Sequence, residues 1–146
     1  MLNDEDKLHN NALGYYKYFL ENEITLKVST ITIAEYCVLG KITDLPLTNI
    51  QILPFNLKEA QRAGEFANIL FTENKVSITS LHPRAIIPND SKLFAQADID
   101  KTIIYFVTSD VRSKSTLKML KNGLIPKFEI ISIDVPFSDT FGILDL

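Results

Sequence analysis

The chain has 146 residues, of which 46 % are hydrophobic and 23 % charged, a size and composition that fit one domain with a single core. No apolar run approaches the roughly 18 residues of a membrane span, and the acidic, polar beginning lacks a secretory signal, so we expect a cytoplasmic protein that does not enter a membrane. The net charge of −3 and the single cysteine, Cys37, exclude an internal disulfide, a cysteine-based zinc cage and a general attraction to nucleic acid.

The first half of the chain alternates between helical and strand patterns. The expected elements are a helix over 8–20, a strand over 24–28, a helix from near 32 to 40, a strand over 50–53 and a helix over 56–70. Asn56 and Glu59 have the cap-x-x-Glu spacing of a helix start, and Gly40 suits a helix end. Cys37 is expected to pack as a small hydrophobic residue.

The second half begins with an irregular stretch over 72–89, which is the best candidate for a mobile loop. The elements expected after it are a helix from 89 that carries Leu93, Phe94 and Ala97 inward, an apolar strand over 103–107, a helix that ends near 123, a strand over 128–133 and a packed tail. This alternation predicts an α/β fold, with a central, mostly parallel sheet and helices on both faces.

Three carboxylates are candidates for chemistry. Asp110 follows the most apolar strand, Glu35 follows the first strand by about one helical turn, and Asp90 begins a helix. Because functional groups gather beyond the carboxyl ends of parallel strands, all three can face the same end of the sheet. Converging carboxylates bind a hard divalent cation such as Mg²⁺ or Mn²⁺, which neutralises their mutual repulsion.

Each acid also has a purely structural interpretation. Glu35 ends the sequence Thr32-Ile33-Ala34-Glu35, which matches a capping box that begins at Thr32. Asp90 can cap a helix or interact with its dipole, and Asp110 can start a turn as an Asx residue. Taken one at a time, the three residues do not decide between a structural and a functional role.

In combination, three motifs resemble those of PIN-domain ribonucleases, especially the small VapC-like toxins. The motifs are VSTITIAEY at 28–36, NDSKLFAQA at 89–97 and FVTSD at 106–110, and the helix entry LPFNLKEAQRAGEFANIL at 53–70 also looks similar. The resemblance covers most of the chain. It implies a single PIN-like domain over 1–146, with a three-layer fold.

The resemblance also implies a function. The chain would be an Mg²⁺- or Mn²⁺-dependent endoribonuclease in which Glu35, Asp90 and Asp110 hold the metal and Thr108 lies near its shell. A bound metal of this kind activates a water molecule and stabilises the leaving oxygen, so no histidine or serine nucleophile is needed. Toxins of this type are held inactive by an antitoxin protein and often form homodimers, so both partners are expected here.

The chain departs from the PIN pattern at its beginning. The first strand of the family, with its aspartate, has no counterpart in this sequence, which leaves two explanations: a truncated chain or a degenerate member. Truncation agrees better with the three remaining acids. We therefore expect weak or no nuclease activity from residues 1–146 alone.

Basic residues near the acids are candidates for RNA contacts. Arg112, Lys114 and Lys118 follow Asp110, and the other rim would be lined by the basic residues Arg84 and Lys92. Taken one at a time, each of them is better explained as part of a solvated helix face. Two further functions stay open: a non-catalytic PIN-like module that binds RNA or protein, and an Mg²⁺-dependent α/β phosphatase-like domain.

Overall fold

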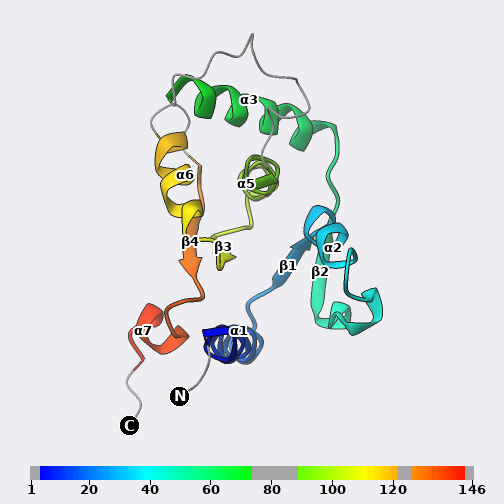
Figure 1. The fold of residues 1–146 in the computed structure, drawn as a ribbon, viewed down its shortest axis with the longest axis vertical. Helices are drawn as coiled ribbons and strands as arrows, with labels where there is room; N and C mark the ends of the chain where they lie inside the picture. Colours follow the sequence, from blue (N-terminus) through cyan, green and yellow to red (C-terminus); the bar gives the residue numbers. More distant parts are fainter. Residues whose placement is uncertain (1–3, 74–88, 122–125, 144–146) are drawn as a thin grey trace.

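The computed structural model describes residues 4–73, 89–121 and 126–143 (Figure 1), and the predicted loop over 72–89 lies almost entirely outside these ranges. The described elements are α1 (Asp4–Glu21), β1 (Leu26–Ser29), α2 (Thr30–Tyr36), η1 (Ile42–Asp44), η2 (Leu47–Asn49), β2 (Ile50–Leu53), α3 (Leu57–Glu73), α5 (Asn89–Ile99), β3 (Tyr105–Thr108), α6 (Arg112–Lys121), β4 (Glu129–Ser132) and α7 (Phe137–Phe141). Their order confirms the α/β class. Within the described ranges, no helix is long and apolar enough to cross a membrane.

The strands form two separate sheets of two strands each, and both sheets are parallel. In one sheet Leu26 of β1 lies opposite Ile50 of β2, and in the other Tyr105 of β3 lies opposite Glu129 of β4. The prediction of parallel strands is therefore confirmed, but the prediction of one continuous central sheet is not. Among the described strands none pairs with both β1 and β3, so side chains connect the two sheets instead of a backbone ladder.

Helices cover both faces of the β3–β4 sheet. Phe106 and Ile130 pack on the core formed by α3, α5 and α6, whereas their neighbours Tyr105 and Ile131 pack on α1 and α7. Successive residues of a strand point to opposite faces, which explains how adjacent positions join different cores. The tail packs as predicted, because the Tyr15 hydroxyl on α1 donates to the Val135 carbonyl (2.6 Å).

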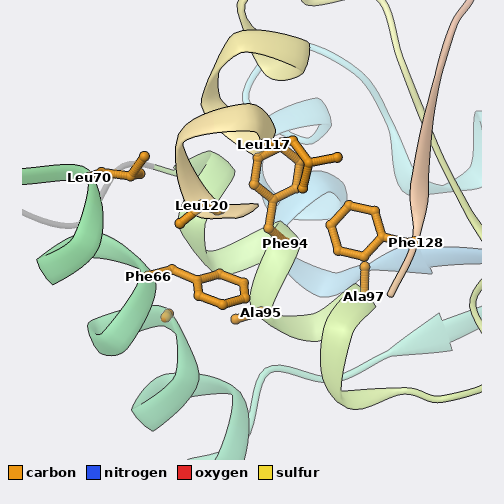
Figure 2. Close-up of a cluster of buried hydrophobic side chains, with 9 residues drawn as sticks. Phe66, Leu70, Phe94, Ala95, Ala97, Leu117, Leu120 and Phe128 are labelled. Carbon is orange, nitrogen blue, oxygen red and sulfur yellow. The ribbon is translucent and has the colours of Figure 1, made fainter. Parts of the chain in front are cut away.

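The larger core lies between α3, α5 and α6 (Figure 2). Phe94 of α5 is fully buried and meets Phe106 edge to face, with ring centroids 4.9 Å apart, and its ring centroid lies 5.5 Å from that of Phe128. Ala97 is also buried, so the predicted inward direction is confirmed for Phe94 and Ala97, whereas Leu93 is only half-buried. This packing fixes α5, and therefore its first turn, against the rest of the chain.

Polar contacts tie α5 to the β1–β2 sheet. The Ser29 hydroxyl contacts Gln96 Oε1 (2.5 Å), and Gln96 Nε2 donates to the carbonyls of Leu53 (3.2 Å) and Pro54 (3.1 Å). Lys27 Nζ donates to Asp100 Oδ2 (2.6 Å) just after the helix ends. These contacts place the carboxyl end of β1 beside α5.

A buried ion pair joins α3 to α5. Asp98 has a side chain that is only 5 % exposed, and its Oδ2 accepts hydrogen bonds from Nε (2.8 Å) and Nη2 (2.6 Å) of Arg62. The Lys127 backbone N–H lies 3.3 Å from Asp98 Oδ1, and the Arg62 guanidinium lies 5.1 Å from the centroid of the Phe66 ring. The pair is thus hydrogen-bonded and well packed, as a buried charge requires.

Two helix starts differ in how well the sequence predicted them. The Asn56 backbone N–H donates to Glu59 Oε2 (3.0 Å), which confirms the predicted start of α3. The predicted start near Thr32 is wrong, because Ser29 is the N-cap of α2 and its hydroxyl accepts from the Ile31 N–H (3.0 Å). Cys37, just beyond this helix, is exposed and does not pack in the core.

Candidate functional site

Asp110 lies directly after β3 and shapes the turn into α6. Its Oδ1 accepts from the Arg112 backbone N–H (2.9 Å), which is the Asx-turn contact, and its own N–H donates to Thr108 Oγ1 (3.0 Å). The Arg112 guanidinium is also close, with Nε 3.3 Å from Oδ1. The backbone and side-chain hydrogen bonds from Arg112 lower the pKa of Asp110, so this carboxylate is firmly ionised.

Asp90 lies in the first turn of α5 and is partly buried. Desolvation by burial raises the pKa of Asp90 most, the negative charge of Asp110 raises it further, and the positive charge of Arg112 opposes both. The negative charge of Glu35 adds a smaller upward shift to the pKa of Asp90. Asp90 is therefore an acid whose ionised form is disfavoured by two neighbouring carboxylates.

Glu35 lies on α2, which begins directly after β1, and its side chain is exposed. Its Oε1 accepts a hydrogen bond from Asn89 Nδ2, and Asn89 immediately precedes Asp90. The predicted capping role of Glu35 is wrong, because Thr32 lies inside α2 and Ser29 caps the helix. Glu35 instead joins the end of α2 to the first turn of α5.

The three predicted acids thus come from three elements, and the charges of Asp110 and Glu35 both act on Asp90 at the start of α5. Their carboxylate oxygens match the ligands that Mg²⁺ and Mn²⁺ prefer. Within residues 4–73, 89–121 and 126–143, no three His, Cys, Asp or Glu side chains form a group that could hold a metal ion. Arg112 instead engages Asp110, and Asn89 engages Glu35. The exposed Arg112 side chain holds Asp110 only weakly.

The predicted RNA-binding residues fall into three groups. Arg112, Lys114 and Lys118 are exposed on α6, the helix that starts beside Asp110. Lys92 is partly buried on α5, one turn or less from Asp90. Arg84 lies outside the described residues. The basic residues of α6 are therefore the best placed to meet a phosphate chain.

Sequence reasoning missed Asn89, which holds Glu35. Its position directly before Asp90 at a helix start is a recognisable signal, since asparagine favours such positions. It also missed Lys121, which continues the series begun by Lys114 and Lys118 at helical spacing.

Comparison of the chain with protein-family models, with curated proteins and with solved structures gave no match. A functional hypothesis therefore depends on the three motifs and on the contacts around the start of α5.

Replacing Asp90 by asparagine is expected to stabilise the metal-free protein at pH 7. A carboxyl whose pKa is raised on folding binds its proton more tightly in the native state, so the wild type loses stability as pH rises through that pKa. Asp90→Asn removes this loss, and we expect the midpoint of thermal unfolding to rise by about 2 °C or less. The difference should disappear below the unfolded pKa, where both proteins carry no charge at this position.

Asp100→Asn is the matched control for this measurement. Desolvation by burial raises the pKa of Asp100, but hydrogen bonds from Lys27 and Thr102 outweigh it, so the pKa is lowered overall. Asp100 therefore contributes stability above its unfolded pKa, and its replacement should lower the unfolding midpoint at pH 7. A fall of the unfolding midpoint in both variants would contradict the electrostatic account of Asp90.

Proposed function

We propose that the chain is an Mg²⁺- or Mn²⁺-dependent endoribonuclease of PIN-like fold, with Glu35, Asp90 and Asp110 as the metal ligands. The observation that carries the proposal is the electrostatic position of Asp90, which is partly buried and repelled by the charges of both other acids. The positive charge of Arg112 offsets part of this repulsion, but among the described residues no cation forms an ion pair with Asp90. A divalent cation would remove this repulsion.

The finer fold is part of the proposal. Parallel strands, helices on both faces of the β3–β4 sheet and acids beyond the carboxyl ends of β1 and β3 are the features that a three-layer PIN-like fold needs. Gln96 and Lys27 hold the two sheets near each other through α5 and the turn that follows it. These contacts support one domain built around a single active-site edge.

The residues of the site have distinct tasks in this mechanism. A metal bound there would lower the pKa of a water molecule and stabilise charge on the leaving oxygen. Asp90 is held by the packed helix α5, and Asp110 is oriented by its backbone contact with Thr108 Oγ1. Arg112, once it leaves Asp110, is placed to bind a phosphate of the substrate beside the acids.

The role of a toxin in a toxin-antitoxin pair, in the cytoplasm, belongs to the same proposal. An antitoxin or a second copy of the chain needs an apolar surface, and three exposed residues after α2 supply one: Val38 (77 % exposed), Leu39 (98 %) and Ile42 (54 %). They lie just after Glu35 in sequence. A protein bound over them would cover the approach to that acid.

A specific observation favours a second candidate, a non-catalytic PIN-like module that binds RNA or protein. Asp110 is engaged by Arg112 and Glu35 by Asn89, so two of the three acids already have partners within the chain. In a binding module these contacts would be permanent. In a nuclease they would open when the metal binds.

A cleavage assay separates the candidates. The whole chain is incubated with a panel of RNAs in Mg²⁺, in Mn²⁺ and in EDTA, and with a phosphomonoester as an alternative substrate. Slow, metal-dependent production of RNA fragments is the expected result. RNA binding without cleavage would favour the binding module, and turnover of the phosphomonoester alone would favour the phosphatase-like alternative and overturn the proposal.

A further inference from the structure

A groove of about 280 Å³ lies between α6 and β4, on the helix that begins beside Asp110. Its lining residues are Lys114, Leu117, Lys118, Lys121, Glu129 and Ile130. Leu117 is buried and Ile130 is partly buried, whereas the three lysines are exposed. The groove therefore combines an apolar base with ammonium groups that reach into solvent.

The lysines stand in one row because of their spacing. Positions three and four apart are neighbours on a helix surface, so Lys114, Lys118 and Lys121 share one face of α6. In the described part of the chain none of them forms an ion pair, and Glu129 is the only acid in the groove lining. Three lysines against one glutamate make this a local basic patch on a chain whose net charge is −3.

The dimensions of the row suit a nucleic-acid backbone. A helix rises about 1.5 Å per residue, so the seven steps from Lys114 to Lys121 cover roughly 10 Å. A stacked strand advances about 3.4 Å per phosphate, which makes the row about three phosphates long. Since α6 starts beside Asp110, the row leads away from the acids.

We infer that this groove is a track for about three consecutive phosphates of single-stranded RNA on one side of the acids. The inference rests on the proposed ribonuclease function and adds to it the path of the substrate. Lysine binds phosphate as a flexible point charge, without the fixed planar geometry of arginine. A row of lysines is therefore suited to successive phosphates, and competition with an acidic peptide tests this assignment.

The test measures RNA binding without cleavage. A fluorescent oligouridylate of about ten nucleotides is titrated with the whole chain in EDTA, at about 50 to 200 mM KCl. The triple variant Lys114→Gln/Lys118→Gln/Lys121→Gln is expected to bind about tenfold more weakly at the low-salt end. Its slope of log K against log salt should fall by about 2, since each single-strand phosphate contact contributes about 0.7.

The matched control is Lys17→Gln/Lys58→Gln/Lys101→Gln, which removes the same charge from exposed positions on α1, on α3 and after α5. It should keep most of the affinity and the wild-type slope. Equal losses in the two triple variants would overturn the inference, because total charge would then explain the binding. The unfolding midpoints of both variants should match the wild type, since exposed lysines contribute little to stability.

Two further outcomes separate this inference from the proposed function. If RNA binding depends on the three lysines but no metal cleaves the RNA, the track stands and the nuclease proposal fails. If the triple variant binds and cleaves as the wild type does, the track fails and the nuclease proposal stands.

A polyglutamate peptide serves as the competing ligand. Lysine-dependent binding of the peptide without lysine-dependent binding of RNA would overturn the track.

Discussion

Replacing Asp110 by asparagine is expected to abolish metal-dependent RNA cleavage, a loss of at least about 100-fold, because even residues that only support metal ligands cost 10- to 100-fold when changed. Asparagine keeps the shape of the side chain and one oxygen, so it can still accept the hydrogen bond from the Arg112 N–H that starts α6. The fold should therefore survive while the charge at the metal is lost. RNA fragments are measured over a long incubation in Mn²⁺, since the wild-type rate is itself expected to be low.

The effect of Mn²⁺ on the midpoint of thermal unfolding is a second measurement, which does not depend on activity. A ligand that binds only the native state raises the unfolding midpoint, so Mn²⁺ should stabilise the wild type and have little effect on Asp110→Asn. Arg112→Gln serves as the comparison, because it releases Asp110 from its cation and should strengthen the response to Mn²⁺. Cleavage that persists undiminished in Asp110→Asn would remove this residue from the proposed mechanism.

Arg62→Met is expected to lower the free energy of unfolding by about 3 kcal/mol, which corresponds to a fall of roughly 10 °C in the unfolding midpoint. Methionine retains an apolar chain that can cover Phe66, but it leaves the Asp98 carboxylate buried without its cation. The remaining contact of Asp98, with the Lys127 N–H at 3.3 Å, is too long to compensate for this loss. Chemical denaturation followed by circular dichroism measures the change.

Two controls identify the source of the loss. Glu65→Gln removes the other carboxylate that contacts Arg62, but this side chain is 45 % exposed, so the effect should be about 0.5 kcal/mol or less. The double variant Arg62→Met/Asp98→Leu removes both charges and should recover most of the stability lost in the single variant. A double variant no more stable than Arg62→Met would assign the loss to packing against Phe66 instead of to the unpaired carboxylate.

The sequence was most informative where structure is decided locally. The alternation of strands and helices, the Asn56 and Glu59 helix start and the inward face of Phe94 and Ala97 all follow from periodicity and capping. Two features were not predictable in this way. Ser29 caps α2 in place of Thr32 and its hydroxyl also contacts the distant Gln96, and Cys37 is exposed just beyond the same helix.

In the candidate site too, some features could be predicted from the sequence and others could not. Its three acids could be placed beyond strand ends or at a helix start from the sequence, although that prediction assumed one sheet and β1 and β3 lie in two. The residues that contact these acids could not be predicted from the sequence. The contact between Asn89 and Glu35 joins residues 54 positions apart, and the side-chain contact of Arg112 with Asp110 depends on how the turn into α6 is built.

The separation of the strands into two sheets gives the two halves of the chain unequal resistance to local unfolding. Between residues 22 and 62, Ser29 is the one buried residue, and the apolar contacts of this stretch with the two cores come from the partly buried Ile24, Leu26 and Phe55. Elements with few buried contacts open at low free energy, well before the whole protein unfolds. We therefore expect amide hydrogen exchange to be slower around Asp90 and Asp110 than in the β1–α2–β2 segment that carries Glu35.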